Sequence, residues 1–306
     1  MFERIRNILR NPKILLAHYL MRPNVSLKYS DKEYIKKLYY LYTGHKLNLD
    51  KPQSFNEKLN WEKLYYCHPL MPKLVDKYDA KEYVAEKIGR EYVVPNYGVW
   101  SSPDEINFDA LPNQFVLKCT HNSGTGMFIC RDKSKINIDN VKEGLRRGLK
   151  ERFYMNAREW AYKHANPRII ADKFLDDHSG AEIQDYKFLC FNGTPKFVYL
   201  SIKGRNVYEN YYDMDFKPVD INHSFPRRKP EFEKPRDFEK MKELAAKLSA
   251  GFPHVRIDFF DVDGHVYFAE FAFYDWAGIR PFKDYDMDLE LGKLFVLPPK
   301  KIVEDC

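Results

Sequence analysis

Apolar residues in the early part of the chain recur at helical spacing, and two capping boxes mark where helices begin. Ser30 is followed by Glu33, and Ser54 by Glu57. In such a pair the hydroxyl and the carboxylate bond N–H groups that the first turn of a helix leaves free. We therefore expect residues 1–70 to form a helical N-terminal region.

Beyond about residue 110 apolar and polar residues alternate, which is typical of strands. Asn192-Gly193 and Asp263-Gly264 predict tight hairpin turns, because both central positions of a type I′ turn need positive φ. Helical spacing returns at 139–163 and 237–250. Together these elements predict an α+β fold with mainly antiparallel hairpins. The strand-like segments are 114–119, 127–130, 168–175, 185–191, 196–202, 254–260 and 266–271.

Composition narrows the class of protein. The chain has 306 residues, 44% of them hydrophobic, with 22 Tyr and 22 Phe, which excludes a disordered chain. The length fits about two domains, and no apolar run is long enough to span a bilayer. With 50 Lys and Arg against 44 Asp and Glu, the net charge is a mild +6. No dense basic run contains aromatic residues, so we expect no nucleic-acid partner.

Cysteine usage and the N-terminus bear on where the protein works. Five cysteines, none in a C-x-x-C pair, argue against a disulfide framework and a zinc site and indicate a reducing cytoplasm. Residues 1–21 are basic, with Arg4, Arg6 and Arg10 between apolar residues at helical spacing. Two interpretations stay open: a helix packed on the body, or a helix on an anionic membrane surface. The second would place a cytoplasmic protein at the inner face of the cytoplasmic membrane.

The first candidate for chemistry is a lysine before a small-residue loop. Lys118 ends an apolar strand, and the loop Thr120–Gly126 follows it. A lysine in that place can meet a phosphate, with loop N–H groups as further donors. The loop is not a Walker A motif, since no G-K-[ST] follows. An ordinary exposed hairpin is the alternative interpretation.

The second candidate is a pair of carboxylates near the C-terminal end. Asp258 and Glu270 lie on strands joined by the Asp263-Gly264 turn, with a parity that allows both on one face. Two such carboxylates can hold Mg²⁺ against a triphosphate. Arg256 projects to the same face, where a guanidinium stabilises charge on a transferred phosphoryl group or an acyl phosphate. A cross-strand salt-bridge cluster is the alternative.

These two segments, in this order, resemble the ATP-grasp superfamily, the fold of D-alanine:D-alanine ligase, from about residue 70 to 280. The run Asp185–Gly193 and the late Phe268-Ala-Glu-Phe are similar to its teichuronopeptide-biosynthesis (TupA-like) type. The resemblance implies an ATP-grasp fold with two α+β subdomains gripping ATP. Its expected parts are a helical N-terminal region at 1–70 and an ATP-grasp domain at 71–306, divided into a small subdomain at about 90–165 and a larger one at about 166–295.

The resemblance also implies the site residues and the reaction. Asp258 and Glu270 would hold Mg²⁺, while Arg256 and Lys118 would act in catalysis, with ATP and Mg²⁺ as cofactors. The expected activity is a carboxylate–amine ligase of cell-surface polysaccharide biosynthesis, which forms an acyl phosphate from small-molecule or saccharide-linked substrates. The expected ATP-binding residues are Lys77, Lys81, Lys118, Ser123, Gly124, Thr125, Gly126, Asp172, Lys173, Phe174, Leu175, Asp185 and Lys187.

Departures from the superfamily pattern keep other functions open. Ala272 stands where the superfamily has an Asn metal ligand, so water or Asp275 would have to replace it. Asp172 stands in place of the frequent Glu. A non-catalytic nucleotide-binding protein is one alternative. A polysaccharide glycosyltransferase is another, because Asp261-Val-Asp263 matches a metal-binding D-x-D, although turn residues explain that pattern more simply.

Overall fold

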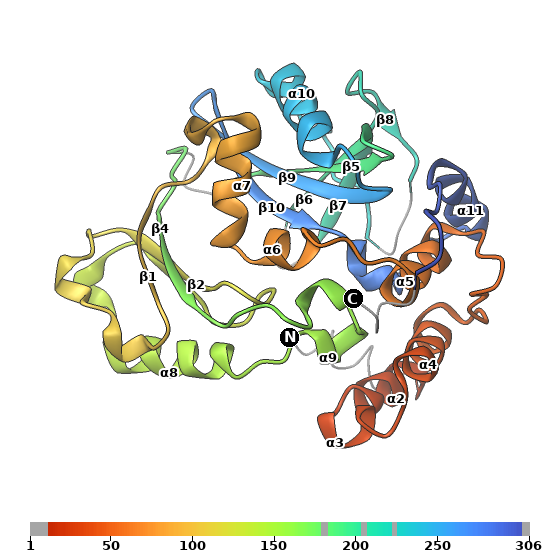
Figure 1. Ribbon diagram of the computed structural model, residues 1–306. Coiled ribbons are helices and arrows are strands. Elements are labelled where there is room, and N and C mark those ends of the chain that lie inside the picture. Colours follow the sequence, from red (N-terminus) through yellow and green to blue (C-terminus); the bar gives the residue numbers. More distant parts are fainter. Residues whose placement is uncertain (1–11, 179–182, 203–206, 222–224, 302–306) are drawn as a thin grey trace.

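Two antiparallel sheets form the strand part of the fold (Figure 1). The computed structural model describes residues 12–178, 183–202, 207–221 and 225–301. The smaller sheet has the strand order β1-β4-β2-β3, and the larger one β10-β9-β5-β6-β7-β8. The strands are β1 (Asn96–Trp100), β2 (Phe115–Cys119), β3 (Met127–Cys130), β4 (Ile169–Lys173), β5 (Asp185–Phe191), β6 (Thr194–Ile202), β7 (Tyr208–Tyr212), β8 (Pro218–Val219), β9 (His254–Val262) and β10 (His265–Ala272).

Helices form an N-terminal group and also cover the sheets. In the part of the chain that the structure describes, none is long and apolar enough to cross a bilayer. The α-helices are α2 (Pro12–Leu20), α3 (Pro23–Ser26), α4 (Asp31–Thr43), α5 (Phe55–Tyr65), α6 (Met71–Val75), α7 (Asp79–Ile88), α8 (Ile138–Leu149), α9 (Tyr154–Ala157), α10 (Phe238–Ser249) and α11 (Tyr285–Leu294). Short 3-10 turns are η1 (Arg90–Tyr92), η2 (Pro103–Glu105), η3 (Phe108–Ala110), η4 (Lys133–Lys135), η5 (Trp160–Tyr162) and η6 (Asp275–Gly278).

The local signals in the sequence are confirmed. Ser30 and Ser54 cap α4 and α5, and each accepts a hydrogen bond from the N–H group of the glutamate three residues later. Both predicted hairpin turns have two positive φ angles, which are 49° and 75° at Asn192 and Gly193. These features form where expected because they depend on neighbouring residues alone.

The helical stretch expected over 139–163 is present as three separate elements. The chain leaves α8 after Leu149 and continues through α9 and η5. At the end of α9, Arg158 takes a left-handed conformation with φ 58°. Its Nε lies 2.7 Å from Asp31 Oδ1, and its Nη2 donates to the Ser26 carbonyl. This contact with the N-terminal helices overrides the local helical preference.

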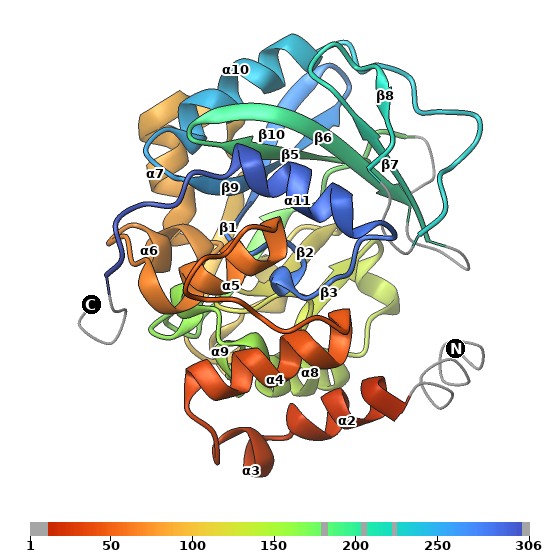
Figure 2. The same cartoon turned by 90° about the vertical axis from the view of Figure 1, so that its right-hand side faces the viewer.

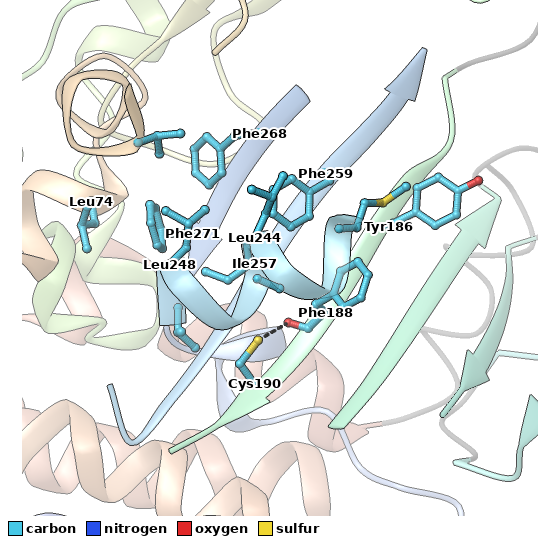
Figure 3. Packing of buried hydrophobic residues seen from close by; sticks show 14 of the residues in the cluster. Leu74, Tyr186, Phe188, Cys190, Leu244, Leu248, Ile257, Phe259, Phe268 and Phe271 are labelled. Atoms are coloured by element: carbon cyan, nitrogen blue, oxygen red, sulfur yellow. Dashed lines mark hydrogen bonds between the residues drawn. The ribbon is translucent and has the colours of Figure 1, made fainter. Parts of the chain in front are cut away.

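One face of the larger sheet forms the main hydrophobic core against α6, α7 and α10 (Figure 3). Phe188 and Cys190 of β5 and Ile257 of β9 point into it, and Leu244 and Leu248 of α10 pack over them. Burial of these side chains removes apolar surface from water. Because side chains alternate along a strand, it also decides which residues of each strand face the core. The intervening residues of β5 and β9 consequently face the other way.

The second face of the larger sheet carries apolar residues at one end and charged residues nearby. Leu189 and Phe191 pack with Phe55 of α5 and with Phe295, which follows α11. Arg256 alternates with the core-facing residues of β9 and is on this face. α5 and the segment after α11 therefore cover the apolar end of this sheet face, and the charged groups lie next to it.

The cysteines only partly follow the sequence expectation. Cys119, Cys130 and Cys190 are free and buried, but Cys67 is disulfide-bonded. Burial raises the pKa of the Cys119 thiol to about 11 and that of Cys190 to about 12. Neither thiol is therefore activated as a nucleophile near neutral pH.

A buried histidine predicts how stability changes with pH. His254 is 1% exposed among the rings of Phe55, Phe191 and Phe295. Burial lowers its pKa to about 4, so below its ordinary pKa the unfolded chain binds the proton more readily than the folded chain does. Acidification from about pH 7.5 to about pH 5 should therefore cost about 2 kcal/mol through this residue alone.

The measurement is urea unfolding of the wild type and His254→Leu at both pH values. We expect the variant to lose about 2 kcal/mol less than the wild type on acidification. Equal losses in the two proteins would show that His254 does not carry the effect.

Candidate functional site

A β-bulge in β10 decides on which face the Glu270 carboxylate lies. Phe268 pairs with Phe259, but Glu270 pairs with Asp258, so Ala269 is an extra residue in the ladder. An unbroken ladder would have turned Glu270 toward the hydrophobic core, because side chains alternate between faces. The bulge brings both carboxylates to the second face of the sheet, as the site requires.

Arg256 is the centre of the charged cluster on this face. Its Nε and Nη2 donate to the two oxygens of Asp258 at 2.7 and 2.8 Å, and its Nη1 donates to Asp275 Oδ1 at 2.6 Å. Nη1 also donates to the hydroxyl of Tyr199 at 3.1 Å, and Nη2 lies 3.7 Å from Glu270 Oε1. Three carboxylates surround one guanidinium, which leaves an excess of negative charge.

Lys187 lies beside this cluster on β5. Its Cα is in register with that of Asp258 across the β5–β9 ladder, and its ammonium pairs with Asp185. Burial raises the pKa of the Asp258 carboxyl above its ordinary value, while Arg256 and Lys187 favour its charged form. Asp185 and Lys187, both expected to bind ATP, thus lie next to the carboxylates.

The smaller sheet contributes a second charged cluster. Asp172 on β4 accepts from two lysines, with Lys81 Nζ and Lys118 Nζ each 3.0 Å from a carboxylate oxygen. Lys81 also donates to the carbonyl of Val94 and is 10% exposed, whereas the Lys118 side chain is 25% exposed. Lys81 is therefore bound within the fold, and Lys118 is the lysine that can reach a ligand.

Lys77 is bonded to the backbone of the glycine loop. Its backbone N–H donates to the Thr120 carbonyl, and its ammonium donates to the carbonyl of Asn122. Burial lowers the pKa of Lys77. Lys77 therefore holds the start of the loop through two contacts.

The glycine loop is fixed at its base and exposed at its tip. His121 Nε2 lies 3.1 Å from the Glu151 carbonyl, and Asn122 Nδ2 donates to the Gly148 carbonyl. Ser123, Gly124 and Thr125 are exposed, and Gly126 is half-buried. His121 is buried, and its ring contacts the backbone at Glu151, so this side chain holds the base of the loop in place.

The strand that carries the expected ATP-binding residues Asp172 and Lys173 belongs to the smaller sheet. β4 pairs with β1 and β2 in the four-stranded sheet. It therefore lies in the same sheet as the strands of the predicted small subdomain, although it follows the boundary predicted near residue 165. At its end the Lys173 N–H donates to the Pro95 carbonyl, and Arg131 lies 5.0 Å from the ring of Phe174. Lys173 is exposed, while Phe174 and Leu175 are half-buried, which leaves this edge accessible.

Two carboxylates form the donor set for a metal. Mg²⁺ is commonly held by one or two carboxylates together with substrate phosphates. Asp258 and Glu270, in a cluster with excess negative charge, fit such a shared ion. Within the described residues no group of three His, Cys, Asp or Glu forms a complete protein cage. Asp275 Oδ1 accepts from Arg256 and Tyr199, and Ala272 offers no ligand atom in place of the expected Asn.

Several residues around the cluster are not identified by the sequence patterns. Tyr199 donates to Asp275 at 3.0 Å, and alternation along β6 could have placed it on this face. Glu159 precedes η5 and is 9% exposed. Burial raises its pKa, and the charges of Glu270 and Arg256 also act on it. No local signal marks Glu159, because its position depends on the turn that ends the α8–α9 segment.

The D-x-D aspartates lie at the far end of the same hairpin. Asp263 is in the turn with φ 53°, and Asp261 pairs with Val266 next to it. Arg256 is paired with Ala272 at the other end of the two strands. The aspartates thus have the turn role that the sequence indicates as the simpler explanation.

Comparison with solved structures gives distant similarity to ATP-grasp ligases. A D-alanine–D-alanine ligase from Helicobacter pylori is 16% identical over 73% of this chain and 61% of its own, with a TM-score of 0.39. The Bacillus anthracis enzyme is 18% identical over 72% and 68%, with a TM-score of 0.39. D-cycloserine synthetase DcsG is 14% identical over 74% and 71%, with a TM-score of 0.40. The chain thus spans less than two thirds of the Helicobacter ligase.

Sequence comparison gives the family. No curated protein matches the chain. The model of the TupA-like ATP-grasp family matches residues 57–296, which include the glycine loop, β4, β5 and the Arg256 cluster. The match covers well over half of the sequence and every segment of the site described above. The chain belongs to the TupA-like ATP-grasp family.

Proposed function

We propose that the chain is an ATP-dependent ligase that joins a carboxylate to an amine, acting in the cytoplasm in cell-surface polysaccharide biosynthesis. The observation that carries the proposal is the Arg256 cluster, in which Asp258 and Glu270 face the same way beside one guanidinium. The partly exposed Lys118, at the start of the glycine loop, supports it as a group that can meet phosphate. The substrates are small-molecule or saccharide-linked carboxylates and amines, and no nucleic acid takes part.

The lysine side would bind the phosphates. Lys118 is the more exposed of the two lysines on Asp172, and Asp172 keeps Lys81 as a partner when Lys118 turns to a ligand. The backbone N–H groups of the exposed residues Ser123, Gly124 and Thr125 would add further donors to phosphate. The end of β4, with Lys173, Phe174 and Leu175, would bind the adenine.

The carboxylate side would hold the metal. Asp258 and Glu270 are the ligands, together with phosphate oxygens, and Mg²⁺ when bound neutralises charge on the phosphates. Asp275 and Tyr199 hold the Arg256 guanidinium in one orientation. Lys187 keeps a positive charge beside Asp258. These groups are therefore set before a substrate arrives, which reduces the reorganisation that catalysis would need.

The reaction transfers the γ-phosphoryl group of ATP. A substrate carboxylate oxygen attacks the γ-phosphorus, the bond to the bridging oxygen breaks, and ADP leaves. The amine then attacks the acyl carbon, inorganic phosphate leaves, and the amine loses a proton as the amide forms. Arg256 stabilises negative charge in both steps, and orientation of the reactants supplies much of the acceleration. No protein nucleophile is needed.

A non-catalytic nucleotide-binding role is the second candidate. Ala272 favours it, because this residue lies opposite Arg256 and offers no metal ligand. The two candidates differ in ADP formation with pooled carboxylate and amine acceptors. An Ala272→Asn variant that forms ADP where the wild type forms none would support the non-catalytic role.

Lys118 provides the first test of ATP binding. Mg-ATP at about 100 times its dissociation constant should stabilise the wild type by about 2.7 kcal/mol, and Lys118→Ala should lose most of that gain. Lys135→Ala is the matched control, because the Lys135 side chain is 80% exposed and pairs with Asp132 at the surface. Thermal unfolding with and without Mg-ATP measures both. Equal stabilisation of the three proteins would contradict the assignment of Lys118.

The metal ligands are tested by the dependence on Mg²⁺. Asp258→Asn and Glu270→Gln should keep ATP binding without metal but lose the additional stabilisation by Mg²⁺, since each removes a ligand charge. Asp263→Asn serves as control, because Asn also tolerates the positive φ at that turn. Isothermal titration with ATP, with and without Mg²⁺, separates the two effects. A loss of metal dependence in Asp263→Asn alone would favour the glycosyltransferase alternative.

Two glycines of the loop provide a matched pair. A Cβ at Gly126 would lie 2.5 Å from Cys119 Sγ and 3.0 Å from Gly148 Cα, whereas one at Gly124 would have no atom within 4 Å. Both residues have positive φ, which costs about 1 kcal/mol for Ala. Gly126→Ala should therefore lower both the unfolding midpoint and the affinity for Mg-ATP more than Gly124→Ala does. The reverse order would show that the loop is not held at Gly126.

A further inference from the structure

The N-terminal helices carry an apolar stripe that the body of the protein does not cover. α2 packs on α4 through the buried Ala17 and Leu20. Leu15, Leu16 and Tyr19 lie on the other side of α2 and are 40%, 53% and 52% exposed. Helical spacing brings these three side chains together along one side of the helix. The stripe is therefore a continuous apolar strip on the surface.

Exposed apolar side chains are concentrated in this part of the protein. Of the eleven large ones among the described residues, five lie in the N-terminal helices and the turn between them, namely Leu15, Leu16, Tyr19, Leu27 and Tyr40. Single exposed apolar residues are ordinary, but a local group marks an interaction surface. Figure 2 shows α2, α3 and α4 together at the end of the molecule opposite α10.

The charge of this region has one sign. Between Pro12 and Ser30 the sequence has three basic residues, Lys13, Arg22 and Lys28, and no Asp or Glu. Arg22 lies over the Tyr19 ring at 5.6 Å, and Lys28 is exposed next to Leu27 in the sequence. Cations therefore flank the apolar stripe, and the partner that fits both features is negatively charged with an apolar layer beneath.

We propose that α2 and α3 dock on the surface of an anionic lipid bilayer. Leu15, Leu16 and Tyr19 enter the headgroup boundary, and Arg22 and Lys28 contact lipid phosphates. A second copy of the chain fits poorly, because two such surfaces repel each other. Nucleic acid would satisfy the cations and leave the leucines in water. Residues 1–11, for which a helix on a membrane surface is one of the two interpretations that the sequence leaves open, lie outside the described residues.

The test is cosedimentation of the full chain with vesicles of phosphatidylcholine, alone or mixed with phosphatidylglycerol. Binding is expected to the mixed vesicles only, and to weaken as NaCl is raised. Leu15→Ser combined with Leu16→Ser should lower the partition coefficient about tenfold or more, as should Arg22→Glu combined with Lys28→Glu. None of these residues belongs to the proposed ATP site, so stabilisation by Mg-ATP should remain unchanged. That result would show that the variants are folded.

The matched control replaces exposed apolar residues elsewhere. Ile138→Ser combined with Val296→Ser removes two side chains that are 40% and 63% exposed and should leave vesicle binding as in the wild type. Equal binding to both kinds of vesicle would overturn the proposal. So would binding that survives Leu15→Ser with Leu16→Ser, or tight binding to single-stranded DNA that the leucine substitutions leave unchanged.

Discussion

The arrangement of the site depends on the pairing of one mostly buried arginine. Arg256 bonds Asp258 on its own strand, Tyr199 on β6 and Asp275 after β10. A buried guanidinium is costly unless its donors are paired with acceptors, so these contacts hold two strands and the η6 turn in fixed positions. Trp276 and Ala277, which follow Asp275, have φ of 47° and 53°, a conformation that surrounding contacts must maintain.

Two different kinds of constraint build the two halves of the site. On the larger sheet, the bulge at Ala269 and the core behind it decide that Glu270 faces Asp258. On the smaller sheet, a short carboxylate at Asp172 holds two lysines, and the loop is fixed by contacts with the end of α8. Both halves therefore present charged groups on rigid elements, while the small residues at the loop tip remain accessible. Charged groups on rigid strands and small residues at an accessible loop tip together suit a ligand that carries several phosphates.

Local features could be predicted from the sequence, and features that depend on distant contacts could not. Caps and type I′ turns are correct because a few neighbouring residues decide them. The helical stretch expected to residue 163 is divided into α8, α9 and η5, and the break at Arg158 goes with its ion pair to Asp31. The common face of Asp258 and Glu270 is right, but only through a bulge that simple alternation does not reveal. Glu159 is buried at a turn whose place is decided by tertiary contacts.

The most direct measurement is a crystal structure of the chain with Mg²⁺ and a non-hydrolysable ATP analogue. Our account predicts phosphate oxygens within hydrogen-bond distance of Lys118 Nζ, with the metal on Asp258 and Glu270 and the adenine at the end of β4. A nucleotide bound elsewhere, or phosphates that contact neither Lys118 nor the Glu270 side of the site, would contradict it.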